Sequence, residues 1–264
     1  MNSPIGILDS GLGGLSVLNE IRNLMPGEDI VYFADSAWCP YGPRPADEIQ
    51  RRVFAITDIL LARHCKLIVI ACNSATIAAV EALRATYPVP FVGMEPAVKP
   101  AAAITRSGTV GVLATEASLA GEKFHRLLHD HADGVKVITR PCPNFVDLVE
   151  RGELDGDRAR GIVEEETLPL IEAGADVLVL GCTHYPFLRP LIQDVVGPDV
   201  KIIDTGAAVA RHALQLLKNR CQPASPQTSC QVITTGDLDT LKKLFPQLCP
   251  GIRAELTSSH QIKS

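Results

Sequence analysis

Aromatic residues are scarce in this chain of 264 residues, at 5%, although hydrophobic residues as a whole make up 46%. The core must therefore be built mainly from aliphatic side chains, which is typical of layered α/β folds. No apolar run reaches the roughly 18 residues that a membrane-spanning helix needs, so we expect no membrane segment. The N-terminus has neither a basic region nor a long apolar region, and we expect no export signal.

Closely spaced cysteine pairs are absent as well, since none of the eight cysteines forms a C-x-x-C motif. This disfavours a secreted disulfide framework and a zinc site, and we expect no metal and reduced thiols in the cytoplasm. The net charge is −5 and no basic stripe is present, which argues against nucleic-acid binding. An acidic ligand would therefore need a local binding site.

Strand-like apolar runs alternate with amphipathic stretches along the chain. The expected strands are 5–8, 29–35, 67–71, 91–94, 109–115, 135–139, 176–180, 200–206 and 231–237. The expected helices are 15–25, 46–63, 74–86, 117–130, 145–152, 157–173 and 207–219, with one more after 237. The turn-rich stretch 221–230 is expected to be an exposed connection. Such alternation predicts right-handed crossovers and mostly parallel sheets.

The strand–helix pattern restarts near residue 98, which indicates a second α/β unit. We therefore expect two similar three-layer lobes, each with a mostly parallel sheet. The first comprises 1–97 and 208–264, and the second comprises 98–207. Ligands of such sheets bind at the carboxyl ends of strands, so we expect the active site in the cleft between the lobes.

Two strand ends carry cysteines, in LIVIACNSAT (67–76) and VLVLGCTHYP (177–186). A thiol has a pKa of about 8.5, which a helix N-terminus can lower. Because Cys72 and Cys182 both come just before an expected helix, both are candidate acid/base groups. The polar residues that follow them suit a carboxylate ligand: Asn73, Ser74, Thr183 and His184. A single cysteine is more often a small buried hydrophobe, the role that we assign to the other six.

Three further residues have both functional and structural interpretations to consider. Asp9 opens DSGLGG, where it could cap a helix or accept a proton, and the segment lacks the last glycine of a dinucleotide-binding loop. His184 could assist proton transfer near neutral pH or be a hydrogen-bonded loop residue. Glu150, judged by sequence physics alone, is a solvated residue of a helix surface.

The segments DSGLGG, YFADSAWCPYG, ACNSAT, NFVDLVERGE and GCTHYP together resemble the motif set of glutamate racemases, in the aspartate/glutamate racemase superfamily. The resemblance implies a cofactor-independent enzyme that interconverts L- and D-glutamate and supplies D-glutamate for peptidoglycan. It also implies a cytoplasmic homodimer. Departures from the common pattern are Trp38, Ser118 and Asp147, where Arg, Thr and Pro are usual.

The resemblance also implies roles for particular residues. Cys72 and Cys182 would be the acid/base thiols, assisted on opposite sides by Asp9 and by the pair Glu150–His184. The residues that would hold the substrate are Asp9, Ser10, Tyr41, Gly42, Asn73, Ser74, Thr76, Thr183 and His184. Two thiols suit racemisation, because a proton must leave one face of the α-carbon and return to the other.

Other functions stay open at this point. An aspartate racemase, or a decarboxylase or other racemase of the same superfamily, would share the paired cysteines. A two-lobed protein that only binds a small molecule is a different class, but it has no need of two thiols. No lysine stands at a comparable strand end, which disfavours pyridoxal phosphate.

Overall fold

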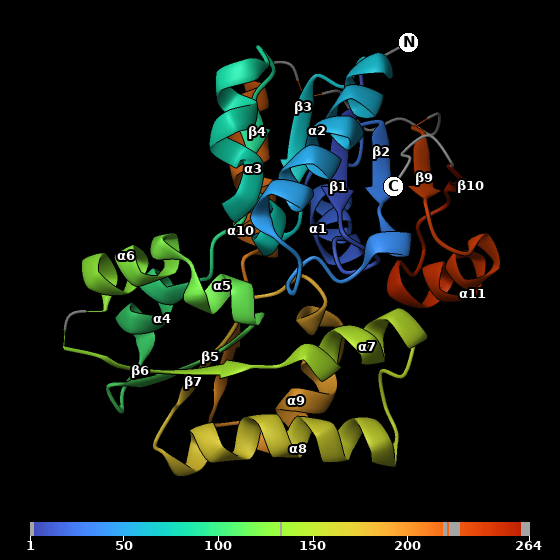
Figure 1. Ribbon diagram of the computed structural model, residues 1–264. Coiled ribbons are helices and arrows are strands. Elements are labelled where there is room, and N and C mark those ends of the chain that lie inside the picture. Colours follow the sequence, from blue (N-terminus) through green and yellow to red (C-terminus); the bar gives the residue numbers. More distant parts are fainter. Residues whose placement is uncertain (1–2, 133, 219–220, 222–227, 260–264) are drawn as a thin grey trace. The chain divides into compact units, whose positions relative to one another are not determined.

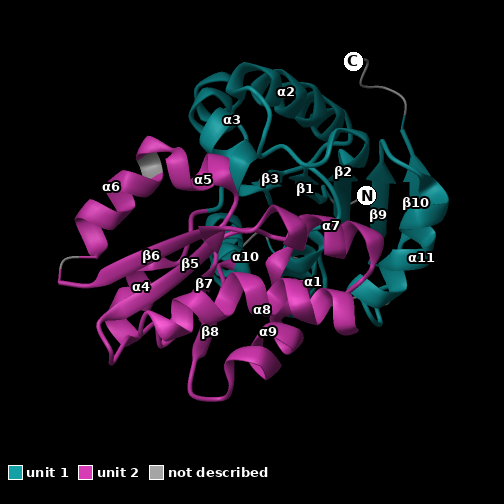
Figure 2. Cartoon of the chain, turned by 60° about the horizontal axis from the view of Figure 1, so that its bottom comes forward, with its two compact units in different colours: residues 1–94, 206–264 teal, residues 95–205 magenta. Residues whose placement is uncertain are grey.

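A computed structural model describes residues 3–132, 134–218, 221 and 228–259 (Figure 1). The chain divides into two compact units, which Figure 2 shows in different colours. Unit 1 comprises residues 1–94 and 206–264, and unit 2 comprises residues 95–205. Each unit holds one sheet, and every strand pair in both sheets is parallel. The prediction of an α/β chain built on parallel sheets is confirmed.

The sheet of unit 1 has six strands in the order β10-β9-β2-β1-β3-β4. These strands are β1 (Ile5–Asp9), β2 (Ile30–Ala34), β3 (Leu67–Ile70), β4 (Phe91–Val92), β9 (Cys230–Thr234) and β10 (Glu255–Ser258). Residues of β1, β2 and β3 are buried throughout, as expected for central strands covered on both faces. The last strand, β10, was not expected from the sequence.

Helices cover both faces of this sheet (Figure 1). They are α1 (Leu15–Leu24), α2 (Ala46–Ala62), α3 (Asn73–Thr86), α10 (Gly206–Leu217) and α11 (Leu238–Leu248), with a short 3-10 helix η1 (Ser36–Trp38). Helices α2 and α3 share a buried cluster with Leu8, Phe33 and Ile70 of the strands. Helices α1 and α10 pack against each other, and α10 also contacts β3. The strand ends are therefore held rigidly by packing on both sides.

Unit 2 has a smaller sheet in the order β6-β5-β7-β8. Its strands are β5 (Thr109–Ala114), β6 (Lys136–Pro141), β7 (Val177–Leu180) and β8 (Lys201–Ile203). Its helices are α4 (Val98–Ile104), α5 (Glu116–Ala120), α6 (Glu122–His131), α7 (Pro143–Arg151), α8 (Asp157–Glu172), α9 (Arg189–Val196) and the 3-10 helix η2 (Tyr185–Leu188). Helices α4 and α6 share a buried cluster with β5 and β7.

One predicted helix is interrupted. The stretch 117–130 was expected to be a single helix, but α5 ends at Ala120 and α6 begins at Glu122. Gly121 between them is extended, at φ −72° and ψ 139°. Glycine loses the most conformational freedom in a helix, so it is a favourable place for the break. Of the expected helix 207–219 and connection 221–230, residues 219–220 and 222–227 lie outside the described residues.

The two sheets repeat one strand order. In unit 1 the first four strands lie as β2-β1-β3-β4, and in unit 2 all four lie as β6-β5-β7-β8. In each sheet the chain first adds a strand on one side and then returns to the other side. Ligands of open parallel sheets bind at the carboxyl ends of the strands beside this switch point. Asp9 ends β1, Cys72 follows β3 and Cys182 follows β7, so these residues occupy that position. Among the described helices, none combines the length and the apolar character needed to cross a membrane.

Candidate active site

Cys72 is the N-cap residue of α3. Its backbone is extended, and its Sγ accepts a hydrogen bond from the N–H of Ala75 at 3.5 Å. The thiol also lies 3.8 Å from Ser10 Oγ, to which it can donate. The positive end of a helix dipole and a donated N–H both favour a negatively charged sulfur. The structure thus gives this cysteine a local environment that suits a thiolate.

Asp9 is fully buried at the end of β1. Its Oδ1 accepts a hydrogen bond from the N–H of Gly11 at 2.7 Å, and the hydroxyl of Tyr32 donates to the carbonyl of Gly11 at 2.7 Å. The N-cap of α1 is Gly14, so Asp9 does not cap that helix. A Cβ on Gly14 would lie 2.8 Å from the Cβ of Asp9. Glycine is therefore required where the loop packs closely against this carboxylate.

Asn73 carries an unusual side chain. It is 4% exposed, and within the described part of the chain neither its Nδ2 nor its Oδ1 has a hydrogen-bond partner. Buried polar groups in native proteins are almost always hydrogen-bonded, because leaving one unpaired costs about 1–3 kcal/mol. The amide lies directly after Cys72 at the start of α3, so it is available to bind a ligand there.

Two of the expected substrate contacts have side chains that are already engaged. The hydroxyl of Tyr41 donates to Asp35 at 2.6 Å, and burial together with the negative charge of Asp35 raises the pKa of Tyr41 well above its ordinary value. Thr76 donates to the carbonyl of Ile70 at 3.3 Å and accepts from the N–H of Met94 at 3.0 Å. A ligand at Tyr41 would therefore meet the backbone, which continues into Gly42.

In unit 2, Cys182, His184 and Glu150 form a chain of contacts. Sγ of Cys182 lies 3.7 Å from Nδ1 of His184, and Nε2 of the same ring lies 2.7 Å from Oε1 of Glu150. His184 is 2% exposed, and the side chain of Glu150 is 20% exposed. Glu150 is therefore not the solvated surface residue that sequence physics alone favoured. A carboxylate that binds one ring nitrogen fixes the imidazole so that its other nitrogen can exchange a proton with the thiol.

The expectation that an α-helix starts directly after each cysteine is correct for Cys72 and wrong for Cys182. Residues 182–184 form a turn, η2 follows, and α9 begins only at Arg189. Pro186 and Pro190 explain the difference, because each lacks an N–H that a regular helix starting here would use. The polar partner of Cys182 is therefore a histidine, whereas that of Cys72 is a helix N-terminus.

Four other cysteines are buried, namely Cys65, Cys142, Cys230 and Cys249. Burial raises the pKa of Cys65 to about 12, and it also raises the pKa values of Cys142 and Cys249 far above the ordinary range. These thiols stay protonated near neutral pH, which fits the interpretation as small hydrophobes. Two buried tyrosines beside the site, Tyr32 and Tyr185, were not predicted from the sequence. Both stand inside the quoted motifs, but nothing in the sequence shows their hydrogen-bond partners.

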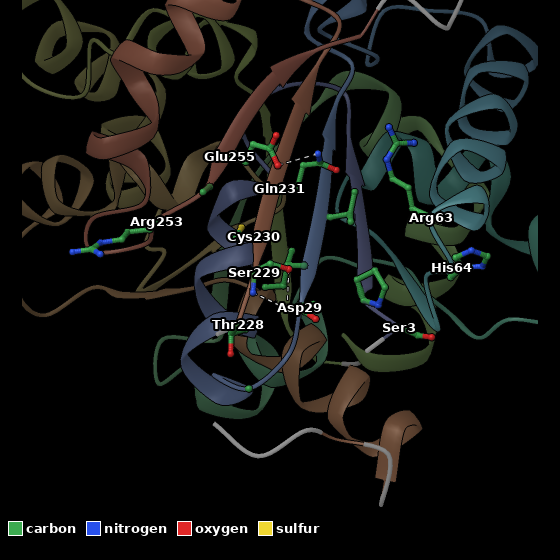
Figure 3. A pocket seen from close by; sticks show the side chains of 15 residues that line it. Ser3, Asp29, Arg63, His64, Thr228, Ser229, Cys230, Gln231, Arg253 and Glu255 are labelled. Atoms are coloured by element: carbon green, nitrogen blue, oxygen red, sulfur yellow. Dashed lines mark hydrogen bonds between the residues drawn. The ribbon is translucent and has the colours of Figure 1, made fainter. Parts of the chain in front are cut away.

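The described part of unit 1 also has a cleft of about 1000 Å³ (Figure 3). Its lining includes Asp29 and Ser229, which are hydrogen-bonded to each other, and Gln231, which bonds to Glu255. These residues lie at the amino ends of the strands, opposite to the edge that carries Asp9 and Cys72. None of the candidate site residues lines this cleft, so we place the active site at the carboxyl edge.

Comparison with known proteins gives the family. The sequence model of the Asp/Glu/Hydantoin racemase family matches residues 5–213. A glutamate racemase of Herpetosiphon aurantiacus is 52% identical over 89% of this chain and 94% of its own length. A glutamate racemase of Pseudomonas entomophila is 51% identical over 94% of each chain.

Solved structures agree with these relatives. A glutamate racemase isoform of Bacillus anthracis superposes with a TM-score of 0.86 at 31% identity, over 99% of each chain. The Escherichia coli glutamate racemase, solved with L-glutamate and the activator UDP-MurNAc-Ala, gives a TM-score of 0.87 at 31% identity, over 97% of this chain and 98% of that chain. The chain therefore belongs to the Asp/Glu/Hydantoin racemase family, and within it to the glutamate racemases.

Proposed function

We propose that this protein interconverts L- and D-glutamate without a cofactor, with Cys72 and Cys182 as the two acid/base groups, and so supplies D-glutamate for peptidoglycan synthesis. The observation that carries the proposal is the repeated placement of a thiol after the third strand of each sheet, beside the switch point. The curated relatives at about half identity are glutamate racemases, and the E. coli structure contains L-glutamate.

Each turnover breaks one C–H bond and forms another. The thiolate of one cysteine takes the α-proton as its S–H bond forms, and the electron pair stays on the α-carbon and its carboxylate. The thiol of the other cysteine then gives its proton to the opposite face, which leaves that sulfur as the thiolate. The carbanion carries a second negative charge beside the carboxylate, so fixed N–H donors must stabilise it.

Local donors are available for both tasks in unit 1. The start of α3 is the positive end of a helix dipole, which favours a carboxylate, and the side chain of Asn73 adds an amide with no hydrogen-bond partner among the described residues. Ser10 and the N–H of Ala75 adjoin the sulfur of Cys72. We assign the substrate carboxylate to the start of α3, and the support of the Cys182 thiol to His184 and Glu150.

Solvent exchange tests the reaction. Incubating reduced protein with either glutamate enantiomer in D₂O should give product that carries deuterium at the α-carbon. Cys72→Ser and Cys182→Ser should each lower turnover by about 10²–10⁴-fold, because a hydroxyl is a far weaker acid than a thiol. Cys221→Ser is the matched control, since this half-buried cysteine lies in neither motif and should keep full activity. Absence of α-exchange in the wild type, or full activity of either motif variant, would overturn the proposal.

The same assay separates the alternatives. The same exchange assay with aspartate tests whether the protein is an aspartate racemase. No contact among the described residues favours aspartate over glutamate, so we expect little exchange. Glutamate binding without exchange would favour a binding protein. We also propose a cytoplasmic homodimer, as the resemblance implies, and light scattering of the purified protein should give twice the mass of 28.3 kDa.

A further inference from the structure

The backbone that follows His184 continues directly into η2, which packs against α7, the helix that carries Glu150. Tyr185 is the first residue of η2 and is fully buried. Its hydroxyl donates to the carbonyl of Cys142 at 2.9 Å, immediately before α7. Its ring meets that of Phe145, on the first turn of α7, edge to face, with centroids 5.1 Å apart and planes at 81°. Tyr185 thus joins the turn after Cys182 to the start of α7.

The partner of this hydroxyl is itself fixed. The N–H of Cys142 donates to the carbonyl of Ala114 at 3.1 Å, at the end of β5, and its carbonyl also accepts from the N–H of Phe145 at 3.2 Å. Desolvation, and secondarily the neighbouring thiols, keep the pKa of Tyr185 well above its ordinary value, so the phenol stays a donor at every working pH. The hydrogen bond therefore ties η2 to a point that the sheet holds in place.

These contacts form a closed loop of covalent and hydrogen-bonded links. It runs from Tyr185 through Cys142 and α7 to Glu150, across the 2.7 Å contact to His184, and back through the peptide bond to Tyr185. The same two elements that Tyr185 joins also carry the two ends of the Glu150–His184 hydrogen bond. Any shift of α7 relative to η2 changes the length of that hydrogen bond and the direction of the ring. It would then also change the 3.7 Å contact between Nδ1 and the sulfur of Cys182.

We propose that Tyr185 is a positioning residue of the racemase: its hydroxyl and ring set the Glu150–His184 hydrogen bond and thereby aim His184 at the thiol of Cys182. This inference rests on the proposed function, since it assigns Tyr185 to the support of one catalytic thiol. It predicts that the hydroxyl matters for turnover only while Glu150 can hold the imidazole.

A double-mutant cycle tests this prediction. Tyr185→Phe keeps the ring and removes one hydrogen bond, so kcat should fall by about 2- to 10-fold with KM little changed. In a Glu150→Gln background, the same substitution should have almost no further effect, because the pair that it positions is already weakened. Tyr87→Phe is the control: it likewise removes one hydrogen bond of a tyrosine hydroxyl, here to the carboxylate of Asp58, but at an exposed place outside the site. Its effect should be absent in both backgrounds.

Two further measurements keep the inference independent of activity and of folding. In ¹⁵N NMR, the ring signals of His184, assigned with His184→Gln, should move in Tyr185→Phe toward their positions in Glu150→Gln. Phe145→Leu, which removes the edge-to-face contact and keeps the hydroxyl, should show the same coupling to Glu150. Losses that multiply in the double variant, or unchanged His184 signals, would overturn the positioning role. A wild type without α-exchange would overturn the proposed function, while the NMR result would still decide the role of Tyr185.

Discussion

The side chain of Asp35 holds the loop that carries Tyr41 and Gly42, and its charge can be removed with little change of shape. Asp35 is fully buried directly after β2. Its carboxylate accepts hydrogen bonds from Arg52 at 2.5 and 2.7 Å, from Tyr41 at 2.6 Å and from Thr235 at 2.8 Å. Arg52 is buried as well, and Trp38 stacks on it at 4.1 Å. Asp35→Asn would therefore leave a buried cation without its counter-charge.

The expected cost follows from this burial. Removing one partner of a buried ion pair costs about 3–5 kcal/mol, because the remaining charge is desolvated and unpaired. Replacing both partners with uncharged side chains of similar size is often close to neutral. We therefore expect a loss of about 3–5 kcal/mol for Asp35→Asn, and a smaller loss when Arg52→Met is added. With a urea m-value of about 2 kcal/mol per molar, the single change lowers the midpoint by about 1.5–2.5 M.

The chain contains its own reporter for this measurement. Trp38 is the single tryptophan, and the guanidinium groups of Arg52 and Arg44 both lie over its ring, the second at 4.4 Å from the ring centre. Its fluorescence during urea unfolding follows unit 1 itself, which matters because a chain of two units need not unfold in one step. A midpoint shift below about 0.5 M for Asp35→Asn would refute the reasoning. The reasoning would also be refuted if the double variant lost as much unfolding free energy as Asp35→Asn and Arg52→Met lose together.

Two other predictions concern stability at low pH and the loop beside Asp9. The pKa of Asp176 is lowered from 3.8 to about 2, by hydrogen bonds from Thr105, Arg106 and Ser107 against the effect of burial. A lowered pKa stabilises the fold above about pH 3.8, and that stability is lost as the pH falls toward 2. The wild type should exceed Asp176→Asn in free energy of unfolding by at most about 2 kcal/mol, a difference that solvent screening reduces. Urea midpoints should show this difference narrowing as the pH falls from about 3.8 to about 2. Gly14→Ala should lower kcat at least about tenfold, because the new Cβ would meet Asp9 and the Tyr32 hydroxyl at 2.8 and 2.9 Å and displace the carboxylate. A kcat equal to that of the wild type would contradict this.

Most strands of this fold could be predicted because each contains a short apolar run, which is how a strand buried on both faces looks in a sequence. Strand β10, with the sequence ELTS, has no such run and was not predicted. The placement of Asp9, Cys72 and Cys182 at strand ends follows from the same runs. Contacts between distant segments could not be predicted in this way. The hydroxyl of Tyr185 reaches a carbonyl 43 positions away, and Glu150 meets His184 across 34 positions. No local pattern records such distances, since the packing of α7 on η2 decides them.

The different surroundings of the two thiols have a thermodynamic consequence. Cys72 is supported by a helix N-terminus and Ser10, whereas Cys182 is supported by an imidazole and a carboxylate. The enantiomers of glutamate have equal free energies in water, so kcat/KM must be the same in both directions for the wild type and for every variant. The difference between the two thiols can therefore not favour one enantiomer at equilibrium. It can only change kcat and KM between the L-to-D and the D-to-L direction, and both constants must then change by the same factor. A substitution in the Cys182 half, such as Glu150→Gln, should change these two constants unequally for L- and D-glutamate while their ratios stay equal.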